Sequence, residues 1–333
     1  MATKNILNET KAIVTTEPKA AVPVKPFADG IYFGLDEQTY HDDLALGSSD
    51  KKSLLVDPTV YWWGSPRNPM REIKEETPAI IRGNAVHKFV LEGADAFKSA
   101  FGRCEFKGNI KAGIVERDDF KENGIVPLAG ALYDRIVLAG SVILMNPHIS
   151  DAFSAGHSEV SVFWTEVIDG MPVRQKARFD YLKTRAIVDL KTHDPRDDLG
   201  FEASCMRAMK IRNMPLQAQS YLTARQHVAK FIADGAVFGD HDAAWLKRVA
   251  ASKESAFVYC FWASKGAPLT WGGYLSPGNR KLQEAQVDID RALKRYVACV
   301  KEFGDDTAWI RPAELAEIDA DNIDNWYRMV GQD

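Results

Sequence analysis

The sequence contains no run of about 20 apolar residues, the length that an α-helix needs to cross a bilayer, so we expect no membrane partner. Its first stretch, MATKNILNETKAIVTTEPKAAVPVKPF, lacks the apolar centre of a secretory signal. Cysteines are scarce: four occur in 333 residues, and none has the C-x-x-C spacing of zinc or redox sites. We therefore expect reduced thiols in a cytoplasmic protein.

An excess of positive charge is missing too. The chain has 42 Lys and Arg against 46 Asp and Glu, a net charge of -4, which excludes a histone-like protein that binds nucleic acid through its overall charge. Hydrophobic residues (46%) and charged residues (26%) occur in ordinary globular proportions, so the chain is expected to fold around a core.

The sequence divides into an arm and one domain. Residues 1–28 alternate Ala, Thr, Lys, Val and Pro with little periodicity, which predicts a flexible arm. Residues 29–333 are expected to form a single domain. Its predicted parts are a helical region over 48–147, a sheet with helices over 158–303 that includes a polar insertion at 234–254, and a tail over 304–333.

Periodicity and turn signals place the expected elements. Apolar spacing predicts helices at 48–57, 79–92, 129–145, 201–231 and 278–303, with a charged loop over 103–126. Alternation of period two predicts strands at 158–168, 172–183, 186–191, 256–263 and 269–275. The first three strands follow one another closely, which indicates an antiparallel meander.

The segment RFDYLKTRAIVDLK carries the most chemical information. Residues two apart in a strand share a face, so Asp189 and Lys191 project together while Leu190 points the other way. The neighbouring strand brings Asp180 into reach. Two adjacent carboxylates repel unless a divalent cation lies between them, and oxygen ligands suit Mg²⁺ or Mn²⁺ better than Zn²⁺. Because D-x-K is a common string, a surface hairpin with a solvated charge pair is the alternative.

Four further polar residues stand on elements around this hairpin. His87 ends a G-x-x-x-H string on a predicted helix, and Glu159 opens the first strand of the meander. Gln217 and Tyr221 form Q-x-x-x-Y, one turn apart on one helix face. Each has a structural alternative. His87 is then a structural histidine, Glu159 is a charge at a strand edge, and Gln217 and Tyr221 belong to an ordinary helix surface.

A basic stretch precedes the hairpin. Arg174, Lys176 and Arg178 share the strand face of Asp180, which predicts a cationic track for a phosphate backbone leading into the site. An exposed basic strand paired with Glu166 or its neighbours is the alternative.

The order G-x-x-x-H, S-E, R-x-D, D-x-K, Q-x-x-x-Y resembles the RecB-like branch of the PD-(D/E)XK nucleases, and more closely the RecE-type exonucleases. The segments GSSDKKSLLVDPTVYWW, RGNAVHKFVLE, AGHSEVSVFW, KARFDYLK, IVDLKTH and LQAQSY are similar to that family as well. The resemblance runs from about Ile31 to Trp326. It implies an α/β fold with a restriction-endonuclease-like core, in which helices flank a mixed central sheet.

The resemblance also implies roles for individual residues. His87, Asp180 and Asp189 would be metal ligands together with the Leu190 carbonyl, and Lys191 would be the catalytic lysine. The acidic residue of the first strand, Glu159, would support the metal network or the DNA. The pair Gln217 and Tyr221 would contact DNA phosphate and brace the site.

The implied cofactor is Mg²⁺, with Mn²⁺ able to substitute. No iron–sulfur cluster is expected, because the cysteines lack the clustered triplet that some RecB-like relatives have. The implied activity is exonucleolytic digestion of linear double-stranded DNA from 5′ to 3′, by a ring-shaped homo-oligomer of a phage, prophage or bacterium. The resulting 3′ overhangs would serve recombination with a single-strand annealing protein. The alternatives are a catalytically idle DNA-binding scaffold, an endonuclease and a single-strand nuclease.

Overall fold

The computed structural model describes residues 26–72, 76–195, 198–312 and 315. Most of the predicted arm, and the part of the predicted tail that holds Trp326, lie outside these residues. Phe27, which falls within the predicted arm, packs against the sheet. Its ring stacks on Phe163 with 5.0 Å between the centroids, and its N–H donates to the Asp43 carboxylate. The packed part of the chain therefore includes Phe27.

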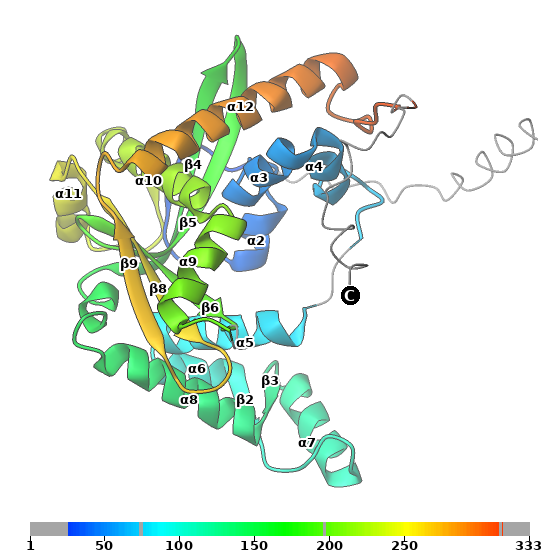
Figure 1. Cartoon of the computed structure of the whole chain (residues 1–333), viewed down its shortest axis with the longest axis vertical. Coiled ribbons are helices and arrows are strands. Elements are labelled where there is room, and N and C mark those ends of the chain that lie inside the picture. Colours follow the sequence, from blue (N-terminus) through cyan, green and yellow to red (C-terminus); the bar gives the residue numbers. More distant parts are fainter. Residues whose placement is uncertain (1–25, 73–75, 196–197, 313–314, 316–333) are drawn as a thin grey trace, which may run out of the picture.

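A seven-stranded mixed sheet forms the centre of the molecule (Figure 1). This confirms the predicted mixed central sheet flanked by helices. In spatial order the strands are β7 (Val237–Phe238), β1 (Gly30–Tyr32), β4 (His157–Ile168), β5 (Met171–Leu182), β6 (Ala186–His193), β8 (Ala256–Ala263) and β9 (Thr270–Leu275). The strands β4, β5 and β6 form the predicted antiparallel meander, whereas β6 and β8 run parallel.

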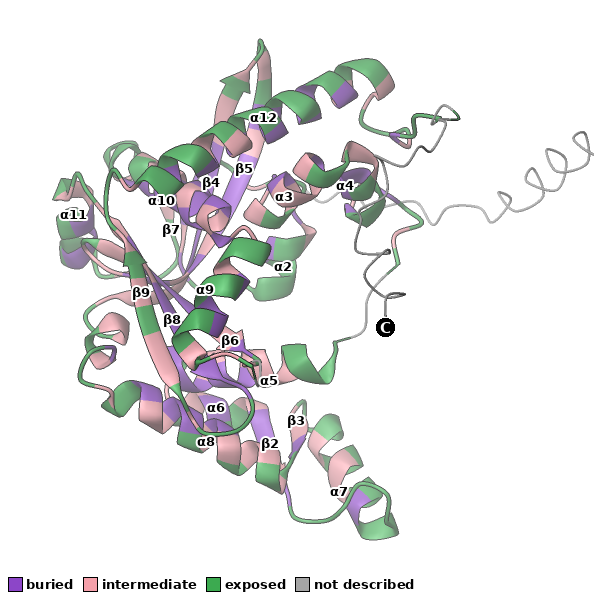
Figure 2. Cartoon of the chain, in the orientation of Figure 1, coloured by how far each residue is buried: buried purple, intermediate pink, exposed green. Residues whose placement is uncertain are grey.

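Helices cover both faces of this sheet. One face packs against α9 (Phe201–Ile211), α10 (Met214–Ala233) and α11 (Ala243–Ala251). The other face packs against α5 (Pro78–His87), the π-helical turn η2 (Lys88–Glu92), α6 (Ala94–Ala100) and α8 (Gly130–Met145). In a further group, α3 (Ser48–Val56) and α12 (Arg280–Phe303) lie against α10, and α4 (Pro58–Gly64) packs on α3 and α12. Figure 2 shows buried residues along the strands and exposed residues on the outer sides of the helices.

The strand β6 lies deep in the sheet, and its alternation orients the site. Ile187 packs in the core beneath α10, whereas Val188 and Leu190 pack in the core beneath α5 and α8. A strand with helices on both faces has apolar side chains on both sides, so a charged residue at Asp189 is an exception. Its side chain is completely buried.

The segment 103–126 differs from the expectation, whereas 234–254 contains a short helix and packs against the core. The loop predicted at 103–126 contains α7 (Lys111–Glu122), whose mostly polar sequence has few apolar residues to mark it as a helix. It stands beside a small parallel sheet of β2 (Phe101–Cys104) and β3 (Val126–Ala129). The segment 234–254, predicted as an insertion, supplies the edge strand β7 and buries Trp245, Leu246 and Val249 in the core beneath α10. Its polar composition concealed those three apolar anchors.

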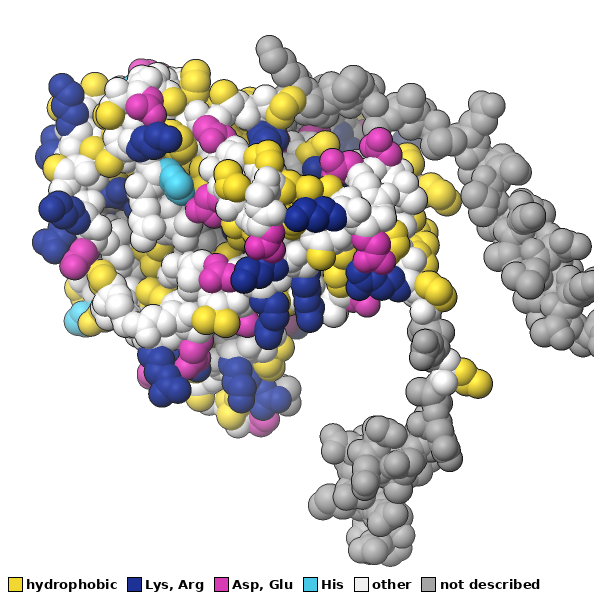
Figure 3. All heavy atoms as spheres, turned by 90° about the horizontal axis from the view of Figure 1, so that it is seen from above, with side chains coloured by type: hydrophobic (Ala, Val, Ile, Leu, Met, Phe, Trp, Pro, Cys, Tyr) yellow, Lys and Arg dark blue, Asp and Glu magenta, His cyan; other side chains and the backbone are white. Residues whose placement is uncertain are grey.

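The surface has a mixed character. On the face shown in Figure 3, basic, acidic and apolar side chains are interspersed. Among the described residues, no helix has both the length and the apolar character that a membrane crossing requires.

The segment 234–254 should be needed for stability. Trp245 is buried, lies 4.4 Å from the His157 ring between centroids, and donates from Nε1 to the Ala155 carbonyl. We expect Trp245→Ala to lower the free energy of unfolding by about 3–5 kcal/mol, because it leaves a large cavity. Trp63 is 48% exposed, so Trp63→Ala should cost less than about 1 kcal/mol. Urea unfolding of both variants measures this, and equal losses would contradict it.

Candidate active site

The candidate site forms where β5 and β6 separate. The two strands pair through Tyr181 with Val188 and Leu182 with Ile187, a register that would next pair Asp180 with Asp189. Pairing stops before that position, because β5 continues along β4 and β6 along β8. Two carboxylates therefore lie at the point where the strands diverge.

The Asp180 side chain provides the hydrogen bond that pairing with β5 would otherwise give to the backbone of Leu190. Its Oδ2 accepts the backbone N–H of Leu190 at 2.8 Å. The Leu190 carbonyl accepts a hydrogen bond from Nε2 of His87 on α5, at 2.9 Å. This bond leaves Nδ1 of a neutral His87 without a proton, and that atom faces Asp180 Oδ2 at 3.9 Å. Three predicted residues, His87, Asp180 and Leu190, are thus brought together.

Asp189 is held from two sides. Its Oδ1 accepts a hydrogen bond from Gln217 Nε2 of α10 at 2.9 Å, and its Oδ2 lies 2.6 Å from Lys191 Nζ. Asp189 and Lys191 share one side of β6, as the two-residue period predicts. The core residue Leu190 points to the other side.

Glu159 and Tyr221 lie beside this centre. The Glu159 carboxylate accepts a hydrogen bond from Arg178 Nε at 2.6 Å, and its backbone has a φ of 55°, a left-handed conformation that is rare within a strand. Tyr221 is buried, with its ring edge-on to Phe179 at 5.6 Å between centroids. Tyr221 also lines the cleft beside the site, and its contact with DNA phosphate stays a prediction.

An open cleft of about 830 Å³ borders the site, and its lining includes His87, Glu159, Arg178, Asp180 and Tyr221. Carboxylates are abundant in the lining, which includes Asp36, Glu37, Glu76, Glu92, Glu159, Asp180 and Asp240. Such a cleft disfavours a phosphate backbone unless cations neutralise it.

Charges in the site shift one another's pKa values. Burial, and then the negative charge of Asp189, raise the pKa of Asp180 to about 7. Burial and the positive charge of Lys191 lower the pKa of His87. Burial alone would lower the pKa of Lys191, but the charges of Asp189 and Asp180 outweigh it and raise that pKa. At neutral pH Lys191 is therefore an ammonium group and His87 is neutral.

Lys52 of α3 is a site neighbour that sequence reasoning missed. Its ammonium donates to the Arg212 carbonyl at 2.8 Å. Burial, and then the charge of Lys191, lower its pKa to about 8. No local string marks Lys52, since it reaches Lys191 only through the packing of α3.

The donor atoms here fit a hard divalent cation in part. Oδ2 of Asp189 is buried and binds the Lys191 ammonium at 2.6 Å, so a positive charge already lies where a cation would bind. Nδ1 of His87 and Oδ2 of Asp180 face each other as two acceptors, an arrangement that a cation would relieve. Within the described ranges, however, no three His, Cys, Asp or Glu side chains converge closely enough to hold a metal ion. A cation would require a rearrangement in which Lys191 leaves Asp189.

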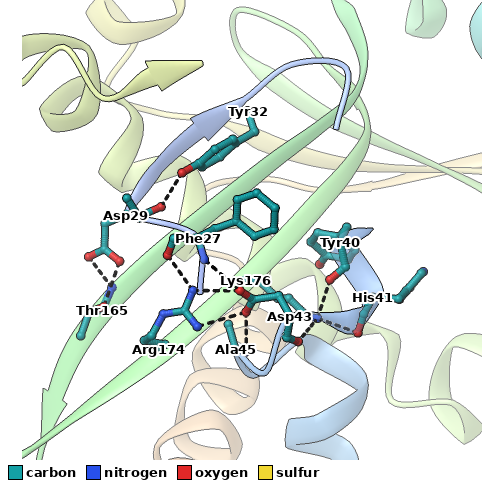
Figure 4. Close-up of polar contacts among 11 residues, drawn as sticks. Phe27, Asp29, Tyr32, Tyr40, His41, Asp43, Ala45, Thr165, Arg174 and Lys176 are labelled. Carbon is teal, nitrogen blue, oxygen red and sulfur yellow. Dashed lines mark hydrogen bonds and ion pairs between the residues drawn. The ribbon is translucent and has the colours of Figure 1, made fainter. Parts of the chain in front are cut away.

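The predicted cationic track is wrong for Lys176. This side chain is only 5% exposed, and its ammonium donates to the carbonyls of Tyr40 (2.7 Å), His41 (3.3 Å) and Asp43 (2.7 Å) (Figure 4). The period-two pattern placed Lys176 on the correct face. It did not show that α2 (Glu37–Asp42) and the residues after it cover that face.

The two arginines of the track are also engaged within the protein. Arg174 forms an ion pair with Asp43 at 3.1 Å and donates to the Phe27 carbonyl at 2.7 Å (Figure 4). Arg178 pairs with Glu159 and donates to the Leu35 carbonyl at 2.7 Å. Glu166, which the sequence offered as a partner for this basic strand, contacts Gln175 and His227 instead. Of the three basic residues, Arg178 alone lines the cleft.

Replacing Asp180 by asparagine should favour the stability of the metal-free protein more at high pH than at low pH. Because the pKa of Asp180 is raised on folding, its contribution to stability falls as pH rises from about 4 to about 7. In EDTA, the stability of Asp180→Asn relative to the wild type should therefore rise by on the order of a few kcal/mol between pH 4 and pH 8. Denaturant unfolding at both pH values checks this. The same stability difference at both would refute the shifted pKa.

Lys176 should act as a structural residue. We expect Lys176→Ala to lower the free energy of unfolding by about 3 kcal/mol, because three carbonyls lose a charged donor. Lys230→Ala removes an exposed lysine of α10 and should change stability by less than about 0.5 kcal/mol. Thermal and urea unfolding compare the two variants. Unchanged stability of Lys176→Ala would contradict the structural role and favour the predicted role of this lysine in DNA binding.

No family model matches the chain, and no curated protein is similar to it. A solved structure described as a "putative exonuclease" from Eubacterium rectale is 16% identical, with a TM-score of 0.47 over 80% of this chain and 88% of that chain. The solved protein SSO0001 is 12% identical, with a TM-score of 0.26 over 56% of this chain and 69% of that chain. At these values a functional conclusion must rest on the site itself.

Proposed function

We propose that this protein is a metal-dependent nuclease of the PD-(D/E)XK type that hydrolyses phosphodiester bonds of DNA. One observation carries the proposal: residues from α5, β5, β6 and α10 meet where β5 and β6 separate. Asp180, Asp189 and Lys191 contribute the D-(x)n-D-x-K arrangement, and His87 and Gln217 bond to its backbone and its carboxylate. A solvated surface hairpin would not bury Asp189 completely.

The residues that would hold a divalent cation are His87, Asp180, Asp189 and the Leu190 carbonyl. Mg²⁺, or Mn²⁺ in its place, supplies charge stabilisation of the scissile phosphate and a bound water of lowered pKa. Oxygen atoms dominate this donor set, as these hard cations require.

The other residues position and balance these groups. Gln217 holds one oxygen of Asp189 and so fixes the rotamer of that carboxylate. Arg178 offsets the charge of Glu159 beside Asp180. In the metal-free state Lys191 is an ammonium group bound to Asp189. A bound cation that displaced it and lowered its pKa would let it lose that proton to solvent, and the neutral amine would then orient the attacking water and accept its proton.

The narrower assignment to the RecE-type exonucleases rests on the resemblance of the motif order. It adds 5′ to 3′ digestion of linear double-stranded DNA in a cytoplasmic setting. It also adds a ring-shaped homo-oligomer, 3′ overhangs for recombination, and an annealing protein as partner. We place the phosphate backbone beside Lys52, Lys191 and Arg212, whose positive charges act on one another, because carboxylates are abundant in the lining of the neighbouring cleft.

Digestion of end-labelled DNA tests the proposal. Linear double-stranded DNA labelled at the 5′ or the 3′ end is incubated with Mg²⁺ or EDTA, beside closed circular DNA. We expect Mg²⁺-dependent release of the 5′ label with intact circles. Lys191→Ala should lower the rate by about a hundredfold or more. Lys98→Ala, which removes an exposed lysine of α6, should leave the rate unchanged.

The outcomes separate the alternatives. Cleavage of circles would indicate an endonuclease, and digestion of single strands alone would indicate a single-strand nuclease. DNA binding without cleavage would favour the idle scaffold. Full activity in EDTA, or in a Lys191→Ala protein whose circular dichroism is native, would overturn the proposal.

A further inference from the structure

The outer face of α9 carries positive charge that no carboxylate balances. This helix lies beside α10 at the surface of the molecule (Figure 1). Arg207 and Lys210 of α9 and its C-cap residue Arg212 are all exposed. Among the described residues, none of the three forms an ion pair with a carboxylate. The sequence has no Asp or Glu from residue 203 to residue 233, so this face is basic in a chain whose net charge is -4.

This basic face begins at the candidate active site. The Lys52 ammonium donates to the Arg212 carbonyl at 2.8 Å. The positive charge of Arg212 acts on the pKa of both Lys52 and Lys191, so its guanidinium group lies near both ammonium groups. Arg207 stands about 7 Å farther along the helix axis. Positive charge therefore continues from Lys191 along α9.

Apolar side chains stand among these cations. Met206 is 54% exposed and Ile211 is 69% exposed. Arg207, Lys210 and Ile211 are three or four residues apart, so they share one side of the helix. Basic residues near the end of a helix favour its dipole, but that effect gives no partner to the two exposed apolar side chains. The face fits a ligand that has both negative charges and apolar surface.

We propose that this face of α9 binds an unpaired strand of the DNA next to the candidate active site. The inference rests on the proposed function, since it assigns a place to the substrate of that site. A duplex presents its phosphates outward and keeps the faces of its bases stacked inside. An unpaired strand presents phosphates together with the apolar faces of its bases. The phosphates would contact Arg207, Lys210 and Arg212, and the bases would contact Met206 and Ile211.

Fluorescence anisotropy in EDTA, at several salt concentrations, tests this proposal with the full chain. The probes are a labelled single-stranded oligothymidylate and a blunt duplex of equal length. We expect Arg207→Ala and Lys210→Ala each to weaken binding of the oligothymidylate about fivefold. Each should also reduce the slope of log affinity against log salt by about 0.7, because one phosphate contact is lost. We expect Ile211→Ser to weaken binding about fivefold and to leave this slope unchanged, since it removes an apolar contact.

Matched variants on other helices serve as controls. Arg248→Ala on α11, Lys98→Ala on α6 and Ile114→Ser on α7 replace exposed residues and should leave binding of the oligothymidylate unchanged. Binding of the blunt duplex should not change in Ile211→Ser. An equal loss on both DNAs in Ile211→Ser would indicate a duplex contact and overturn the proposal. Unchanged binding of the oligothymidylate in the three α9 variants, or equal losses in the controls, would overturn it as well.

Digestion assays of the wild type separate this inference from the proposed function. Mg²⁺-dependent cleavage, combined with full oligothymidylate binding in the three α9 variants, would refute the strand contact and leave the nuclease in place. Weakened binding in those variants of a protein that cleaves no DNA would support the strand contact and refute the nuclease. A wild type that does not bind the oligothymidylate would overturn the strand contact whatever the outcome of digestion.

Discussion

The hydrogen bond from the Leu190 N–H to the Asp180 carboxylate is the contact on which the candidate site depends. Strands β5 and β6 leave each other at this position, and a buried N–H would otherwise lack a partner. Asp180 satisfies it, and the Leu190 carbonyl becomes available to His87 on α5. On the other side of β6, Asp189 can then bond to Gln217 of α10. Because the two strands diverge here, helices from both faces of the sheet, α5 and α10, bind the same group of polar residues.

Several Lys and Arg side chains of this chain are buried and bind polar groups or aromatic rings inside the protein. Lys51 is completely buried, contacts Ser220 Oγ at 3.3 Å and lies over the Trp164 ring at 5.2 Å. Lys176 and Arg225 donate to backbone carbonyls in a similar way. An acidic net charge and buried cations leave few basic groups near the candidate site, and Lys52 and Arg212 beside Lys191 are therefore conspicuous.

Sequence periodicity was informative where structure is local. The two-residue period predicted the strands of the meander and placed Asp189 and Lys191 on one side of β6, with Leu190 on the other. It could not predict what covers a strand face, and so Lys176 was assigned to a DNA track although residues 40–43 enclose it. The two-residue strand β7 and the approach of Lys52 to Lys191 depend on distant packing, for which no local pattern exists.

During synthesis of the chain, β1 is made long before the two strands that pair with it. This strand, made early, pairs with β4 about 130 residues later and with β7 about 205 residues later. Such long separations slow folding, because loop closure precedes the stabilising contacts. Until residues 237–238 have left the ribosome, one edge of the nascent sheet stays open to strands of other molecules. Chaperones that shield an exposed strand edge would act on the chain during that interval.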